Sequence, residues 1–225
     1  MDIIEFYPSI TEELLDKALK FASTKTEQPI SNETIKIIKH SRKSFLFSKN
    51  ANGETTPWIK KDGLFDVTMG APDGAEVCEI VGLFLLNEIR EKIKDIDFGI
   101  YRDDGIASHR RLSGPRLDQI HKELHQIFKE HGLRITIEPP NLTRSNFLDV
   151  TMDLEQENYA PYRKPNDRPL YVHRESNHPP NILREIPKSI NKRLSSISSS
   201  ATEFNTAKAD YQQALNVSGY THQLE

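Results

Sequence analysis

The segment from Glu76 to Lys94 constrains the fold of this chain most, because it is strongly apolar at helical spacing. Drawn as a helix, it has apolar residues around most of its circumference: Val77, Ile80, Val81, Phe84, Leu85 and Ile89. Such a helix must be covered by other elements on several sides, so the pattern predicts a core helix. Its longest apolar run, Ile80 to Leu86, is far short of the roughly 20 residues that span a bilayer. The sequence therefore predicts no membrane-spanning helix.

The segments around this helix predict an α+β fold. Further helices are expected at about 12–22, 33–40, 115–131 and 202–216. Strands are expected at 133–138 and 147–154, and hairpins at 97–108 and at 44–60, around Asn50-Ala51-Asn52-Gly53. We expect an antiparallel sheet backed by the helices near 12–22, 76–94 and 115–131.

The composition narrows the class of protein. Of 225 residues, 36% are hydrophobic and 28% are charged, which is ordinary for a folded protein. The single cysteine, Cys78, excludes an internal disulfide and a cysteine-rich zinc module. Asp2 and Glu5 stand where a secretory signal would be basic, so we expect an intracellular protein, nuclear or cytoplasmic.

The charges are segregated along the chain, although the net charge is only -3. Residues 34–61 hold seven Lys and Arg and one Glu, and residues 163–193 hold eight Lys and Arg and three acids. This distribution predicts two basic surfaces suited to nucleic acid. Solvated faces that bind nothing are the alternative interpretation.

Three acids carry the candidate chemistry: Asp2 at the end of the first expected strand, and Asp103 with Asp104 at the expected hairpin tip. Nucleotidyl transfer uses two divalent cations about 3.5 to 4 Å apart, and Mg²⁺ takes carboxylate oxygens as ligands. An ordinary Asp-Gly turn and a helix-capping aspartate are the alternatives. Strand alternation would place Tyr101 and Asp103 on one side, which ranks Asp103 above Asp104.

Five segments occur in the order of the motifs of a reverse transcriptase palm. Residues 2–10 (DIIEFYPSI) resemble motif A, 65–74 (FDVTMGAPDG) motif B, and 101–104 (YRDD) the aromatic-any-Asp-Asp box of motif C. The helix ending at Gly132 resembles motif D, and 146–150 (NFLDV) resembles motif E. Residues 162–179, with Arg163-Lys164-Pro165 and Ser176-Asn177-His178-Pro179, resemble Penelope-like retroelement polymerases.

This resemblance implies site residues and ligands. Asp2, Asp103 and Asp104 would be the catalytic acids that hold two Mg²⁺ ions, which Mn²⁺ can replace. Tyr7 would be the steric gate against a 2′-hydroxyl; its alternative is a core tyrosine. Other nucleotide-binding residues would be Ile3, Phe6, Gly70, Ala71 and Pro72, and the primer grip would be Phe147 and Leu148. The implied partners are an RNA template, a DNA primer and deoxynucleoside triphosphates, with no membrane; no oligomeric state is predicted.

The resemblance also implies how the chain is divided. A palm would span 1–160, with a partial fingers insert at about 31–64, and a thumb- or connection-like helical region would span 161–225. Most of the fingers would be missing, since only Met1 precedes the motif A aspartate. Asp73 and Arg102 depart from the motifs, which usually have apolar or small residues there.

The function predicted from the sequence is that of an RNA-directed DNA polymerase of a retroelement. The alternative is a truncated, catalytically inactive relic that binds RNA or a protein partner, which the missing fingers favour. An RNA-directed RNA polymerase on the same palm is a third function, and the aromatic ring of Tyr7 argues against it.

Overall fold

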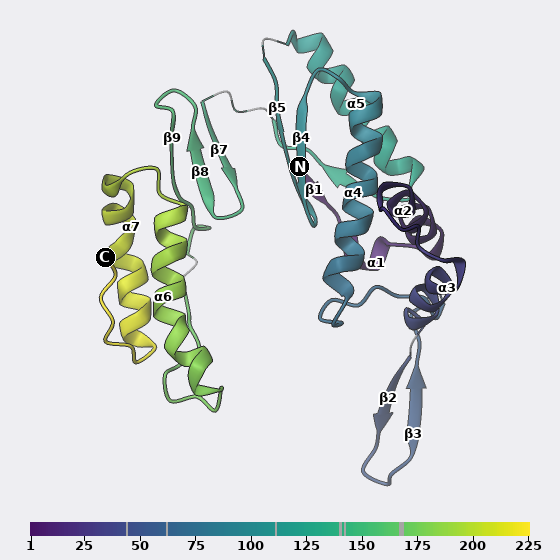
Figure 1. Ribbon diagram of the computed structural model, residues 1–225, viewed down its shortest axis with the longest axis horizontal. Coiled ribbons are helices and arrows are strands. Elements are labelled where there is room, and N and C mark those ends of the chain that lie inside the picture. The colour runs from purple at the N-terminus through teal and green to yellow at the C-terminus, as the bar shows by residue number, and fades with distance from the viewer. Residues whose placement is uncertain (44, 62, 111, 140, 142, 167–168) are drawn as a thin grey trace. The chain divides into compact units, whose positions relative to one another are not determined.

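The computed structural model describes residues 1–43, 45–61, 63–110, 112–139, 141, 143–166 and 169–225 (Figure 1). The chain divides into two compact units, unit 1 (Met1–Glu138) and unit 2 (Pro139–Glu225). Each unit has a hydrophobic cluster of its own, so each is described separately.

Unit 1 combines helices with an antiparallel sheet. Its elements are β1 (Asp2–Ile3), α1 (Phe6–Ser9), α2 (Glu12–Lys25), α3 (Asn32–Ser41), β2 (Leu46–Lys49), β3 (Thr55–Trp58), α4 (Gly74–Lys92), β4 (Asp97–Tyr101), β5 (Asp104–Ser108), α5 (Gly114–Glu130) and β6 (Ile135–Thr136). The main sheet has the order β4-β5-β1-β6, and each neighbouring pair is antiparallel. The short β1 therefore lies inside the sheet, although it comes first in the chain.

Helix α4 is the centre of the core of unit 1, as the apolar pattern predicts. Val81, Leu85 and Ile89 are fully buried, and the helix contacts α2, α5 and β4. Helix α2 begins after Thr11, whose side-chain oxygen accepts a hydrogen bond from the backbone N–H of Leu14 at 3.1 Å. That cap satisfies one of the backbone donors left open at a helix start.

The predicted hairpin at 44–60 is present as β2 and β3, with the positive φ of Gly53 in its turn. All of its strand residues are exposed, including Phe47 and Trp58, and the Trp58 ring N–H donates to the Ser48 hydroxyl at 2.8 Å. The hairpin is therefore held by its own ladder and cross-strand contacts, and its apolar side chains lie outside the core.

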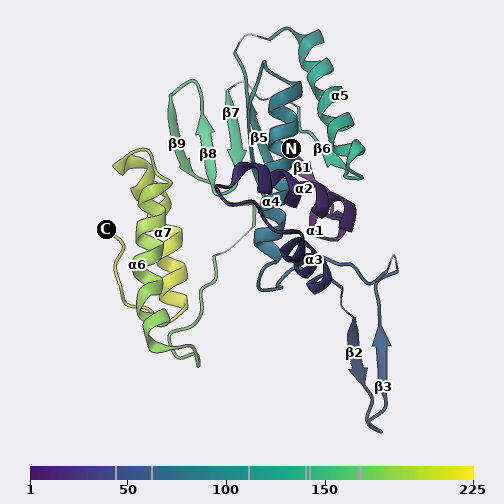
Figure 2. The ribbon, with the colours of Figure 1, turned by 45° about the vertical axis from the view of Figure 1, so that its right-hand side comes forward.

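Unit 2 pairs a three-stranded antiparallel sheet with two helices. Its elements are β7 (Arg144–Phe147), β8 (Val150–Asp153), β9 (Asn158–Pro161), α6 (Pro180–Ser196) and α7 (Ala201–Val217), and its sheet has the order β7-β8-β9. Helices α6 and α7 lie side by side (Figures 1 and 2). Their buried residues, among them Leu194 and Leu215, form the second cluster with Tyr220 and Leu224.

Three sequence-based expectations are corrected by the structure. Residues 147–154 form two strands and not one, because the chain turns at Leu148, which has a φ of 53°. The predicted strand at 133–138 pairs over only Ile135 and Thr136. The hairpin at 97–108 turns at Arg102 and Asp103, so Asp104 and Gly105 already belong to β5.

The division between the units also differs from the predicted one. The sheet β7-β8-β9 falls in unit 2, which begins at Pro139, whereas the predicted palm extends to residue 160. The assignment of 1–160 to a palm domain stays a prediction. Within the described residues, no helix combines the length and the apolar character needed to cross a membrane.

His131 makes the stability of unit 1 sensitive to acid. Its ring lies edge-on against the Phe84 ring, with 5.1 Å between the ring centroids. Burial lowers the pKa of His131, and the nearby charge of Glu88 partly opposes this shift. Because the unfolded chain takes up a proton near the ordinary pKa of 6.5 and the folded chain does not, stability is lost as pH falls below about 6.5.

We predict that His131→Phe reduces this loss, measured as the change in the free energy of urea unfolding between pH 7.5 and 5.5. His125→Gln, at an exposed position of α5, is the matched control and should keep the acid sensitivity of the unchanged protein. Equal pH dependence in all three proteins would contradict the assignment.

Candidate functional site

The interior position of β1 brings Asp2 opposite Asp104, although they lie far apart in the sequence. The Ile3 N–H donates to the Asp103 carbonyl and the Gly105 N–H donates to the Met1 carbonyl, each at 2.8 Å. These bonds flank the Asp2–Asp104 pair and leave it as a non-hydrogen-bonded pair, the type in which opposed side chains approach most closely. Both side chains therefore leave the same face of the sheet.

Asp103 lies in the tight turn between β4 and β5, next to the strand ends that carry Asp2 and Asp104. Arg102, the other turn residue, has a φ of 55°, a left-handed conformation that residues other than glycine rarely adopt. The guanidinium of Arg102 lies over the Tyr101 ring at 5.4 Å from its centroid. Among the described residues Arg102 forms no ion pair with an acid.

The argument that ranked Asp103 above Asp104 does not hold, because strand alternation does not continue through a turn. Tyr101 is the cross-strand partner of Asp104, so these two residues share a face. Asp103 lies between them at the tip, with an exposed side chain. The geometry therefore does not rank Asp103 above Asp104 as a metal ligand beside Asp2.

The acids offer the donors that Mg²⁺ prefers, since all are carboxylates at neighbouring backbone positions. Within the described part of the chain, however, no three His, Cys, Asp or Glu side chains converge closely enough to hold a metal ion. The backbone places the donors together and the side chains do not form a coordination shell. Asp2 and Asp103 are exposed, and Asp104 is half-buried.

Tyr7 lies beside this edge, at the start of α1. Its ring packs near Gly74, and its hydroxyl lies against the buried thiol of Cys78. Burial raises the pKa of Tyr7, and burial raises the pKa of Cys78 to about 11, with Asp103 adding to both shifts. Both groups are therefore neutral near pH 7, and Tyr7 is only half-buried. The side chains of Ile3 and Phe6, by contrast, are 1% and 3% exposed and belong to the core.

The loop before α4 holds Gly70, Ala71 and Pro72 next to the helix start. Gly70 has a φ of 90°, and the Ala71 N–H and Gly74 N–H close successive turns on the carbonyls of Thr68 and Ala71, each at 3.1 Å. Gly70 and Pro72 are exposed and Ala71 is half-buried. These three residues form a turn before a helix with an accessible surface.

Two cations fasten this loop to the rest of unit 1. The Arg42 side chain, 8% exposed, places Nη2 2.6 Å from both carboxylate oxygens of Asp73. Lys60 donates to the Pro8 carbonyl at 2.7 Å and pairs with Asp66 at 3.0 Å. Asp73, which stands where motif B usually has an apolar residue, therefore has a structural role, because it binds Arg42.

The predicted primer-grip residues belong to unit 2. Phe147 ends β7 and is half-buried, and Leu148 occupies the β7–β8 turn with 42% of its surface exposed. Neither belongs to the described hydrophobic clusters, although both are apolar residues at the end of a strand.

Sequence reasoning missed the contacts that hold the site together: Arg42 with Asp73, Lys60 with Pro8 and Asp66, and Tyr7 with Cys78. The sequence marked Asp73 only as a departure from the motif, without a partner for it. Asp73 makes no side-chain capping hydrogen bond and instead binds Arg42, the residue that follows α3.

Comparison with known proteins gives a match to a family model and similarity to solved structures. A model described as an animal helix-turn-helix domain matches residues 170–224, which contain α6 and α7. No curated protein matches the sequence significantly.

The fold of the chain is similar to that of telomerase from Candida albicans, in a structure with a TWJ fragment of telomeric RNA. The TM-score is 0.55 at 10% identity, over 96% of this chain and 40% of that chain. The present chain therefore spans about 40% of the telomerase chain that it matches. At this identity the likeness shows a shared fold.

We predict that Arg42→Met destabilises unit 1 by about 1 to 3 kcal/mol in urea unfolding, since hydrogen bonds to charged groups are worth that much. Lys49→Met, at an exposed position of β2, removes the same charge and should have little effect. A double-mutant cycle of Arg42→Met with Asp73→Asn should show a coupling above about 0.5 kcal/mol. Additive effects would show that the pair is not formed in solution.

Proposed function

We propose that unit 1 is the catalytic palm of an RNA-directed DNA polymerase of the retroelement type. The observation that carries this proposal is the register of the main sheet, which sets Asp2 opposite Asp104 with Asp103 at the adjoining turn. The similarity of the fold to telomerase, which is a reverse transcriptase, supports it. So does the order of the five sequence motifs.

Asp2, Asp103 and Asp104 would hold two Mg²⁺ ions by turning their carboxylates toward one another. Bound there, Mg²⁺ supplies activation of the primer 3′-hydroxyl and neutralisation of the leaving pyrophosphate. The sheet's contribution is to hold the acids on one rigid edge before the ions arrive. Pre-positioned donors lower the cost of assembling a site.

Tyr7 and the loop at Gly70–Pro72 would shape the space for the incoming nucleotide. The Tyr7 ring packs near Gly74, and its hydroxyl contacts Cys78. These contacts would fix the position of the ring while part of its surface stays exposed. A fixed ring can exclude a 2′-hydroxyl and favour deoxynucleotides. Arg42 and Lys60 would keep the loop and the Tyr7 segment in place.

A second candidate function is RNA binding without catalysis. It is favoured by one observation, that no three metal-binding side chains of the described residues converge. The helix-turn-helix match in unit 2 agrees with a nucleic-acid partner for either function.

We predict that the protein extends a DNA primer on an RNA template with deoxynucleotides and Mg²⁺. Asp2→Asn, Asp103→Asn and Asp104→Asn should each lower the rate by at least about 100-fold, because each removes a charged ligand of the ions. Asp97→Asn, on the same hairpin and exposed, is the matched control and should retain activity.

Metal binding provides a readout that does not need activity. Millimolar Mg²⁺ or Mn²⁺ should raise the midpoint of thermal unfolding of the unchanged protein and of Asp97→Asn, but not of the three other variants. Stabilisation without extension would favour the second candidate function. An inactive protein that no divalent cation stabilises would refute the catalytic proposal.

We predict that Tyr7→Ala increases the incorporation of ribonucleotides relative to deoxynucleotides, because it opens the space beside the sugar. Tyr7→Phe is the matched control, since it keeps the ring and removes only the hydroxyl that contacts Cys78. The measurement is the ratio of kcat/KM for the two sugars. Unchanged sugar selection in Tyr7→Ala would show that the ring is a packing residue.

A further inference from the structure

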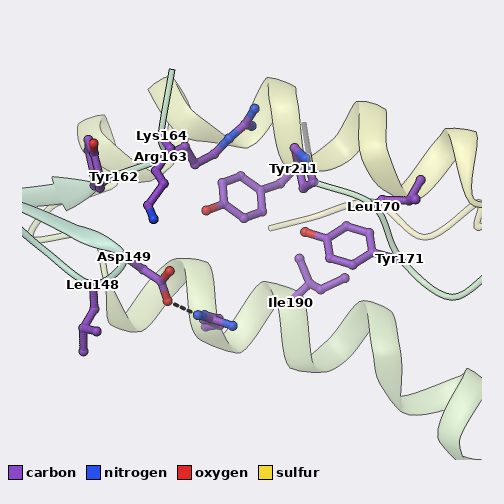
Figure 3. A pocket seen from close by; sticks show the side chains of 11 residues that line it. Leu148, Asp149, Tyr162, Arg163, Lys164, Leu170, Tyr171, Ile190 and Tyr211 are labelled. Carbon is purple, nitrogen blue, oxygen red and sulfur yellow. Dashed lines mark hydrogen bonds and ion pairs between the residues drawn. The ribbon is translucent and has the colours of Figure 1, made fainter. Parts of the chain in front are cut away.

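Unit 2 contains a concave pocket that borders Leu148 of the predicted primer grip and to which the proposed function assigns no ligand. Its volume is about 410 Å³, within the range of sites that hold small ligands, roughly 300 to 1,000 Å³. The β7–β8 turn, the segments that follow β9, and helices α6 and α7 all line it (Figure 3). It is therefore assembled from segments that are distant in the sequence and close in the fold.

One part of the pocket is cationic. Arg163, Lys164 and Arg193 line it, and among the described lining residues Asp149 is the only acid. Asp149 forms an ion pair with Arg193, which orients the guanidinium (Figure 3). Lys164 is exposed and forms no ion pair with the described residues. Arg163 pairs with Asp210 and Arg193 pairs with Asp149, so Lys164 is the cation of this part whose charge no described ion pair offsets.

The other part of the pocket is aromatic and apolar. Tyr171 and Tyr211 are half-buried, with Ile190 beneath them, and both pack against the core of unit 2. Figure 3 shows their hydroxyl groups directed toward the end of the pocket at which Asp149 and Lys164 lie. Burial raises the pKa of Tyr171 to about 12, so its hydroxyl stays protonated near pH 7 and can donate a hydrogen bond.

The two parts are joined by Arg163. Its guanidinium lies over the Tyr211 ring at 5.8 Å from the centroid, and it pairs with Asp210 at 3.3 Å. The backbone N–H of Tyr162 donates to the Asp149 carbonyl at 2.7 Å, which fixes the segment that carries Arg163 and Lys164 against the β7–β8 turn. The charged and aromatic groups are thus held in place by contacts within the fold.

We propose that this pocket binds one nucleotide of a single-stranded nucleic acid, with its phosphate at Lys164 and Arg193 and its base against Tyr171 and Tyr211. Cations beside aromatic rings are the combination that single-strand binding proteins use, because phosphates need charge and every base has a π face. Inorganic phosphate alone would leave the aromatic part unused. The excess of Lys and Arg over residues 163–193 favours a polyanion over a single small anion.

The first test measures binding of a fluorescently labelled eight-nucleotide RNA to the full chain without Mg²⁺. Lys164→Gln should weaken binding several-fold and reduce the slope of log K against log salt concentration by about one, as expected for one lost phosphate contact. Tyr211→Leu keeps apolar bulk and should weaken binding about tenfold through lost stacking.

The diagnostic variant is Asp149→Asn, because it should strengthen binding. It removes the carboxylate that pairs with Arg193 and so releases this cation, and structural damage would not strengthen binding. Lys188→Gln is the matched control, since Lys188 is exposed on α6 and lies outside the pocket lining. Its affinity for the RNA should equal that of the unchanged protein.

Competition experiments show which kind of ligand the pocket prefers. Adenosine monophosphate, a DNA strand and a tyrosine-phosphorylated peptide are tested as competitors. Competition by DNA or RNA strands supports the proposal, and competition by the peptide alone overturns it. The monophosphate competing as well as a strand would also overturn it, because the pocket would then be a site for free nucleotides.

The Asp103→Asn variant should bind the RNA unchanged at this pocket, so a failure of the catalytic proposal does not affect the test. With 4-thiouridine in the RNA, photocrosslinks should map to peptides that contain Tyr171 or Tyr211. Equal affinities in Lys164→Gln, Asp149→Asn and Lys188→Gln, or crosslinks that avoid both tyrosines, would refute the proposal.

Discussion

The insertion of β1 between β5 and β6 is the constraint on which unit 1 depends. This strand has only two residues, yet its backbone bonds on both sides connect the N-terminus to a hairpin and to a strand more than 100 positions away. Long-range pairing of that kind is costly in chain entropy, and the burial of Ile3 and of the α4 core offsets the cost. The same pairing sets the distance from Asp2 to Asp104 in β5 and to Asp103 in the preceding turn.

The proposed chemistry depends on how firmly the sheet and the turn fix the backbone positions of the three acids. The backbones of Asp2 and Asp104 are fixed by flanking hydrogen bonds, and Asp103 is fixed by a turn with an unusual residue, Arg102, in the left-handed region. Among the described residues the three carboxylates do not converge, so the proposed ion site requires their side chains to turn toward one another. Strain of this type is often found at functional positions, and here it falls beside the candidate acids.

The sequence predicted much of the fold where a pattern is local. The apolar pattern of α4 located that helix within two residues at each end, and the Asn-Gly signal found the β2–β3 hairpin. Helix α6 has no such signal, because Pro179, Pro180 and Pro187 mark a loop by local rules, whereas packing of Ile190 and Leu194 favours a helix. The turn at Arg102 was misplaced because the Asp-Gly pair nearby is the commoner turn sequence.

The candidate site was predicted residue by residue only through its resemblance to a family, and its supporting contacts were not predicted at all. Arg42 and Asp73 are 31 positions apart, and nothing in the local sequence of either indicates the other. Such pairs depend on the tertiary fold. In the same way, the pocket of unit 2 exists because α6 and α7 pack side by side against the segment after β9.

The most direct test of the central claim is cleavage of the polypeptide by Fe²⁺ bound in place of Mg²⁺. A carboxylate site that holds Mg²⁺ also binds Fe²⁺, and ascorbate with peroxide then cuts the backbone beside the bound ion. The account predicts cuts in two places at once, near Asp2 and near Asp103–Asp104, both suppressed by excess Mg²⁺. Cuts at only one of these segments, or cuts that Mg²⁺ does not suppress, would contradict it.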